Sequence, residues 1–210
     1  MNLEEMRAIV RRDLHDLDGT NYRWSDEELN RHISHAVKDL SEACPVEQRA
    51  LINTSPGSRD IDISALIDLI IVEAVAYPEG QIPINYQRFS WWGDTITLLS
   101  EIVPDGSDAA IYYGALHTLD DDSSSIPTWQ EELIVCGASG YSAVELSVYS
   151  INRVNTGGSQ TFAELESWGN AKLLFFRKEL KRLHRKNRVR MRMLYSPETN
   201  VVNQTTDFGP

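Results

Sequence analysis

The stretch from Ile126 to Leu183 constrains the fold most, because it has the pattern of two long helices joined by a short loop. The first helix is expected from Pro127 to about Val154, since proline suits the first turn of a helix. Residues 155–159 include two glycines and are typical of a turn. Thr161 and Glu164 form a capping-box pattern at the start of the second helix. We therefore predict a long helical hairpin.

Both helices of this hairpin carry an apolar stripe, because apolar residues recur every three or four positions. Gly137 and Gly140 lie inside the first stripe, and each costs about 1 kcal/mol relative to alanine in a helix. We expect another backbone to pack closely there. A core scaffold is the simplest interpretation of this pattern, so function is expected in what is attached to it. The stripes consist of Trp129, Leu133, Cys136, Gly137, Gly140, Tyr141, Val144, Val148 and Ile151, and of Phe162, Leu165, Trp168, Leu173, Phe176, Leu180 and Leu183.

Two shorter helices are predicted ahead of the hairpin. Residues 2–17 keep an apolar period of three and four, and the sequence after them is typical of a helix end. Ser25 and Glu28 form a capping box that starts a second helix, which runs to about Ala43. Pro45 closes that helix. With the hairpin, these segments make a four-helix unit.

Between helices two and three the apolar period changes to two, which indicates an inserted antiparallel β-module. Pro56-Gly57 and Gly93-Asp94 are turn signals, the second of them a two-residue hairpin connection. The fold class is therefore α+β, with a module of five or six strands that forms a barrel or a sandwich. The predicted domains are a helical core over 1–47 and 120–186, the module over 48–119 and a C-terminal arm over 187–210. The strands are expected within 50–54, 60–64, 66–77 (a turn and then a strand), 88–92, 95–99 and 109–119.

Aromatic residues crowd this module, at Tyr86, Phe89, Trp91, Trp92 and Tyr112-Tyr113. Adjacent tryptophans on a strand point to opposite faces of the sheet. We expect one of Trp91 and Trp92 to lie in the module's core. The other must be covered by a helix of this chain or by a neighbouring subunit.

The C-terminal arm alternates cationic and apolar residues, with Arg188, Arg190 and Arg192 between Val189, Met191 and Met193. This period of two predicts that the helix ends near Lys186 and that an extended strand follows. Such a strand needs a sheet edge to join. The residues from Tyr195 onward have no period and are expected to be disordered or to lie along a partner.

Charge is unevenly distributed along the chain. The whole chain carries −11 and residues 161–210 carry +5, so residues 1–160 carry −16. An acidic body with a basic end favours self-complementary assembly or a specific acidic partner over general nucleic-acid binding. No segment is predicted to span a membrane, and no signal peptide is predicted. Cys44 and Cys136 are expected as small core residues in a reducing compartment.

No catalytic constellation is evident, and no cofactor is predicted. His32 and His35 lie three apart on a helix, where a surface or interface pair is favoured over a metal site. Asp120–Asp122 lacks the alternation of a calcium loop and is interpreted as a solvated acidic turn. The basic run from Arg177 to Arg192 is either a solvated helix face, a surface that docks on an acidic protein groove, or a nucleic-acid contact. Docking is favoured.

Several stretches together resemble the head-to-tail adaptor (connector or head-completion) proteins of tailed bacteriophages. The likeness covers most of residues 1–186 as a pattern of elements. It is carried by three parts of the chain. The first is the opening from Met6-Arg7 through Asn21-Tyr-Arg-Trp-Ser-Asp-Glu-Glu-Leu29, and the second is Phe89-Ser-Trp-Trp-Gly-Asp-Thr-Ile-Thr-Leu98. The third is the Ile126-Pro127 start, followed by Gly137-Ala-Ser-Gly-Tyr-Ser-Ala143 and Tyr149-Ser-Ile-Asn-Arg-Val-Asn155.

This resemblance implies a structural, non-enzymatic role in the virion neck at the portal vertex, with the host cytoplasm as the place of assembly. Such adaptors form a ring, usually of twelve subunits, under the portal protein, and present a surface to the next neck or tail protein. Packaged DNA passes through without sequence-specific binding. Trp91, Trp92 and Tyr86 are candidate subunit or neck contacts. Portal docking is expected from Arg177, Lys178, Lys181, Arg182, Arg185, Lys186, Arg188, Val189, Arg190, Met191, Arg192 and Met193.

Three other functions stay open from the sequence. The aromatic β-module suits a binding module for glycans or proteins, with Tyr86, Trp91 and Asp94 as a platform. The basic arm suits a DNA-binding regulator. An enzyme of unrecognised type is the third alternative. For an adaptor, deletion of residues 187–210 is expected to leave a folded chain that cannot join particles.

Overall fold

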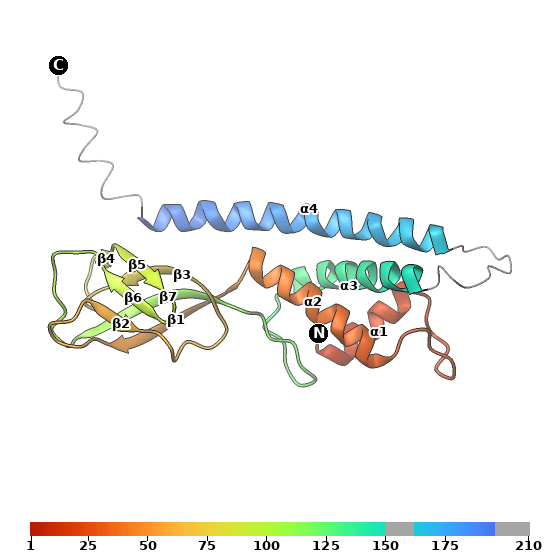
Figure 1. Ribbon diagram of the computed structural model, residues 1–210, viewed down its shortest axis with the longest axis horizontal. Coiled ribbons are helices and arrows are strands. Elements are labelled where there is room, and N and C mark those ends of the chain that lie inside the picture. Colours follow the sequence, from red (N-terminus) through yellow and green to blue (C-terminus); the bar gives the residue numbers. More distant parts are fainter. Residues whose placement is uncertain (150–161, 196–210) are drawn as a thin grey trace, which may run out of the picture. The chain divides into compact units, whose positions relative to one another are not determined.

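A computed structural model of the chain describes residues 1–149 and 162–195, with the backbone alone for 149 and 188–195. The fold is α+β, with four helices and two antiparallel sheets in the described part of the chain (Figure 1). It divides into two units, residues 1–44 with 117–184 and residues 45–116 with the described end of the last helix from residue 185. The first is called the helical unit here, and the segment 45–116 is called the β-unit. The domain boundaries expected from the sequence were 47/48 and 119/120. The helices are α1 (Leu3–Asp13), α2 (Asp26–Ala43), α3 (Thr128–Tyr149) and α4 (Phe162–Tyr195).

The helix starts follow their local signals. Ser25 and Glu28 form the predicted capping box of α2, and Asn2 and Glu5 form a second one at α1. The predicted end of α1 near Leu17 is wrong, because the helix ends at Asp13. His15 adopts a left-handed backbone with φ of 53°, and Leu17 is 65% exposed.

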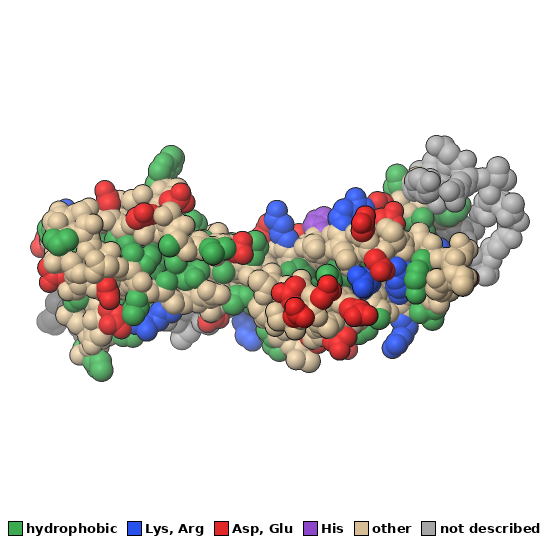
Figure 2. Space-filling model, turned by 90° about the horizontal axis from the view of Figure 1, so that it is seen from below, with side chains coloured by type: hydrophobic (Ala, Val, Ile, Leu, Met, Phe, Trp, Pro, Cys, Tyr) green, Lys and Arg blue, Asp and Glu red, His purple; other side chains and the backbone are tan. Residues whose placement is uncertain are grey.

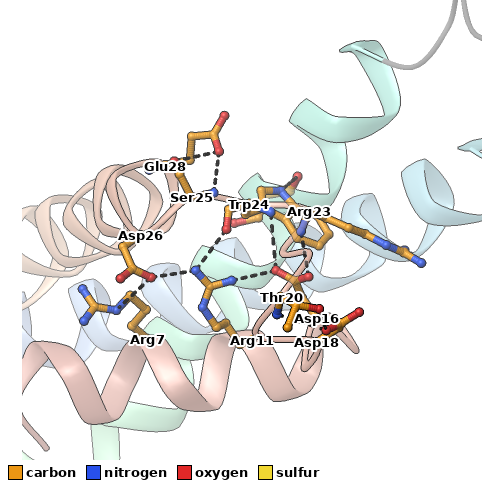
Figure 3. A network of polar contacts seen from close by, with 11 residues as sticks. Arg7, Arg11, Asp16, Asp18, Thr20, Arg23, Trp24, Ser25, Asp26 and Glu28 are labelled. Atoms are coloured by element: carbon orange, nitrogen blue, oxygen red, sulfur yellow. Dashed lines mark hydrogen bonds and ion pairs between the residues drawn. The ribbon is translucent and has the colours of Figure 1, made fainter.

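A buried ion network ends α1 early (Figure 3). The Arg11 guanidinium donates to Asp16 at 2.7 Å and to Asp26 at 2.6 Å, and it also donates to the carbonyl oxygen of Trp24 at 3.0 Å. Asp16 in turn accepts from the backbone N–H of Arg23 at 2.8 Å. A buried charge must be paired, so Arg11 holds the residues after Asp13 in a loop. The apolar spacing that continues to Leu17 would otherwise favour a longer helix.

The close approach predicted at the glycines of α3 is confirmed. A Cβ atom on Gly137 would lie 2.9 Å from the Phe176 ring, and one on Gly140 would lie 2.9 Å from Leu173. The pairs that meet along α3 and α4 run in opposite directions, so the helices pack antiparallel, and Figure 1 draws them side by side. The predicted loop over 155–159, Thr161 and the first helix beyond Tyr149 lie outside the described residues, so the connection stays a prediction.

The predicted strand over Arg188–Met193 is wrong, because α4 continues as a helix to Tyr195. Arginine and methionine are good helix formers, and Val189 is the one β-branched residue of the stretch. Three alternations are too few to outweigh helix propagation from α4. Residues 196–210, the predicted tail, lie outside the described residues.

The β-unit has two antiparallel sheets around one core, and they form no closed barrel. One sheet has the order β1-β7-β3-β4 and the other β2-β6-β5. Buried residues of both sheets, among them Val75, Ile96 and Ile111, belong to the same hydrophobic cluster. There are seven strands where five or six were predicted, since the two-residue β4 was missed. They are β1 (Val46–Asn53), β2 (Asp60–Asp62), β3 (Leu69–Ala76), β4 (Tyr86–Gln87), β5 (Phe89–Trp92), β6 (Thr95–Leu98) and β7 (Asp108–Ala115).

The β5–β6 hairpin turns at Gly93-Asp94 as predicted, since Trp92 pairs with Thr95. Trp91 pairs with Ile96 and shares the core side with it, so Trp92 points to the other face. The prediction that one of the two rings would be buried in the core is wrong. Trp91 is 39% exposed and Trp92 is 90% exposed. Both residues sit at the turn end of β5, which is an edge strand of its sheet.

Candidate interaction surfaces

The basic face of α4 is the first candidate surface. The side chains of Arg177, Lys178, Lys181, Arg182, Arg185 and Lys186 are all exposed. Arg182 is bound to Glu179 of the same helix at 2.7 Å. Residues 188–193 share the helix, but their side chains lie outside the description. Six exposed cations within ten residues make this the strongest basic surface on the described side chains, because α4 holds ten Lys or Arg against three Glu.

A groove between α3 and α4 was not found from the sequence, because its walls come from stripes that pattern analysis assigns to the core. It has a volume of about 610 Å³. Trp129 and Phe175 on its walls are 64% and 55% exposed. Lys172 lies 5.1 Å above the Trp168 ring and is paired with Asp13 at 2.9 Å. The groove is lined mainly by Trp129, Leu133, Cys136, Trp168, Phe175 and Leu183.

The aromatic residues of the β-unit are distributed over both of its sheets. Tyr86 belongs to the sheet of β1, β7, β3 and β4, whereas Trp91 belongs to the other sheet. The Tyr86 ring meets Tyr112 edge-on at 6.0 Å between centroids. The Trp91 indole donates to the carbonyl oxygen of Gly93 at 2.7 Å. Trp92 therefore stands as an isolated exposed ring beside a turn that this bond holds.

His32 and His35 do share a face, where both line a pocket of about 300 Å³ between α2 and α3. Of the predicted surface or interface pair, the surface alternative is wrong for His32, which is 6% exposed. Its Nε2 lies 2.9 Å from Glu145 Oε2 without the alignment of a hydrogen bond. Burial lowers the pKa of His32, although the Glu145 carboxylate acts in the opposite direction. This side chain is therefore held mostly neutral at pH 7.

The ring of His35 stacks on Tyr141, with centroids 4.2 Å apart. Tyr141 donates to Asp39 at 2.5 Å, and burial together with this hydrogen bond raises its pKa to about 12. Tyr141 and Glu145 are four residues apart on α3, so both face α2. That spacing is the signal that would have placed them beside the histidines. The pocket is a polar packing contact between α2 and α3, since its charged groups pair with one another.

Acidic residues outnumber basic ones over residues 1–160, which carry −16, and Figure 2 shows a patch of Asp and Glu side chains on the helical unit. Asp120 begins the acidic turn and accepts from the backbone N–H groups of Asp122 and Ser123 at 2.9 and 2.6 Å. These bonds lower the pKa of Asp120. The β-unit alone, residues 45–116, holds ten Asp or Glu against three Arg.

The part of the chain that the structure describes was searched for a metal site and for a membrane-spanning helix. No group of three or more His, Cys, Asp or Glu side chains among residues 1–149 and 162–195 is placed to hold a metal ion. Over the same described residues, no helix has both the length and the apolarity that a bilayer span requires. Cys44 and Cys136 are free thiols, each partly buried, and burial raises the pKa of Cys136.

No protein-family model matches the sequence, and no curated protein is similar to it at a significant level.

Proposed function

We propose that this chain is a structural head-to-tail adaptor of a tailed phage. In this proposal, copies of the chain form a ring of about twelve beneath the portal, extend the DNA channel and join the capsid to the next neck or tail protein. The role is non-enzymatic. The chain is incorporated into the virion neck after assembly in the host cytoplasm.

The separation of charge carries this proposal. α4 has a net charge of +7, whereas residues 1–160 carry −16. Six of its cations are exposed on successive turns, where they add little to the stability of the fold. A surface of this kind suits docking on an acidic protein partner, because complementary charge speeds encounter and fixes orientation. The portal is that partner in the proposal.

An acidic body also suits a channel for DNA. Phosphates are repelled by a surface of the same sign, so DNA slides past such a wall without being held. The pattern of elements that resembles the phage adaptors adds to this argument. The β-unit is larger than the corresponding part of the smallest adaptors, which are nearly all helical. We assign it to contacts around the ring.

The direct test mixes the purified chain with the portal ring from the same genome. Light scattering reports the mass of each component and of the mixture, and negative-stain images show where mass is added. Density added to one end of the portal is the expected result. No association, together with absence of the chain from purified particles, would refute the proposal.

A glycan or protein receptor is the second candidate, and the 90% exposure of Trp92 favours it. An exposed indole is a common stacking surface for a ligand. A screen of saccharides followed by tryptophan fluorescence separates the two functions. A Trp92-dependent shift with a saccharide, in a chain that does not bind the portal, would favour the receptor.

A further inference from the structure

The β5–β6 hairpin presents a rigid aromatic projection. Trp92 is the most exposed of the described aromatic side chains, and Asp94 lies beside it in the turn. The bond from the Trp91 indole to the Gly93 carbonyl fixes the turn. Tryptophan is enriched among the residues that dominate interface energies.

The α3–α4 groove has the opposite shape and suits such a projection. Its walls include Trp129, Trp168 and Phe175, so an inserted indole would find aromatic rings to pack against. Two cations and two carboxylates line it as well, namely Lys172, Arg182, Glu132 and Glu179, and each cation is in an ion pair with a carboxylate of the same chain. A pocket of about 610 Å³ is within the range of sites that bury a ligand of drug size.

The β-unit and α4 also carry opposite net charges. The β-unit carries −7 over residues 45–116, and α4 carries +7. The projection thus stands on an acidic unit and the groove on a basic helix. Both halves of the contact belong to this chain, which argues for a second copy as the occupant.

We infer that Trp92 of one copy inserts into the α3–α4 groove of a neighbouring copy. Such a contact joins two different surfaces, so it is heterologous and closes into a ring or continues as a filament. The inference rests on the proposed ring in one respect, namely that copies of the chain associate, and it names the side chains that make that association.

Photo-crosslinking tests the contact directly. A benzophenone amino acid replaces Trp92 in the full-length chain, and isotopically heavy chain is mixed with light chain at high concentration. Crosslinks between heavy and light peptides are expected from position 92 to residues 129–136 and 168–183. The matched control carries the same probe at Ile67, which is 78% exposed in the β-unit and should not reach the groove. Crosslinks confined to one chain, or to another surface, would overturn the inference.

Sedimentation measures the energy of the same contact. Trp92→Ala and Phe175→Ala are each expected to weaken self-association at least tenfold, with unchanged circular dichroism because both side chains are exposed. The double variant should lose little more than either single variant, since both remove one contact. Ile67→Ala is the control for removal of an exposed apolar side chain.

The two proposals fail separately. Self-association that is unchanged in both variants, or a chain that stays monomeric at every concentration tested, would overturn the groove contact even if the chain binds the portal. Association that depends on Trp92 and Phe175, without portal binding, would refute the adaptor role and leave the contact standing.

Discussion

Gly140 of α3 and Gly169 of α4 face each other with no side chain between them. A Cβ atom on either residue would lie 3.1 Å from the carbonyl oxygen of the other. The contact is therefore between two backbones, which cannot move apart as a flexible side chain can. This pair fixes how closely α4 approaches α3, and with it the geometry of the groove beside them.

Replacement of Gly140 tests the close approach of the α3 and α4 backbones. Gly140→Ala should gain about 1 kcal/mol of helix propensity but destabilise the fold by a net of roughly 1–2 kcal/mol, because overpacking forces the helices apart. Urea unfolding measures the difference. The control is Asn170→Ala, an exposed position next to Gly169 that should be neutral or stabilising. A more stable Gly140→Ala chain would show that the helices are not in close contact.

Loss of the buried cation in the α1 network should be costly. Arg11→Met leaves Asp16, which is 3% exposed, without its ion-pair partner. We expect a loss of about 3–5 kcal/mol in the free energy of unfolding. Adding Asp16→Asn should recover part of this loss, because the uncompensated charge is removed. Additive effects of the two substitutions would contradict the coupling.

The buried histidines should make stability depend on pH. Burial lowers the pKa of His32 and of His117 in the folded chain. The unfolded chain then binds protons more readily, so stability is full above the unfolded value of about 6.5 and falls as the pH drops below it. Thermal unfolding between pH 8 and 5.5 measures this loss.

His32→Gln should flatten part of that profile, and His117→Gln another part. The control is Asn170→Gln, an exposed position on α4 without a titrating side chain that should leave the profile unchanged. If the two buried histidines can be replaced without altering the pH dependence, other groups must cause it.

Charge reversal on α4 separates docking from folding. A chain with Lys178→Glu, Lys181→Glu and Arg185→Glu should unfold within about 0.5 kcal/mol of the parent, because these side chains are exposed. Its affinity for the portal should fall at least tenfold. The matched control reverses Arg12, Lys38 and Arg23, exposed cations elsewhere on the helical unit, and changes net charge equally. An equal loss of portal affinity in both triple variants would mean that binding depends on net charge and not on the basic face of α4.

Truncation after Lys186 should leave a chain that unfolds cooperatively but is not incorporated into particles. The deletion removes the end of α4 together with residues 196–210. Truncation after Tyr195 assigns the effect to the helix or to the residues beyond it. Normal incorporation of the shorter chain would contradict the docking role of this region.

Local signals in the sequence determined much of the secondary structure. The Ser25–Glu28 capping box placed the start of α2, and the Gly93-Asp94 turn placed the β5–β6 hairpin, because both depend on residues near one another in the chain. The class α+β, the four helices and the close packing at the glycines of α3 also follow from periodicity.

Tertiary contacts decided the rest. The sequence could not end α1 at Asp13, because that end depends on Arg11 meeting Asp16 and Asp26 across a loop. It could not bury His32, since the burial needs α3 against α2. Nor could it identify the α3–α4 groove, whose apolar walls have the same spacing as a core stripe. Periodicity gives the face on which a side chain lies, and only packing decides whether anything covers that face.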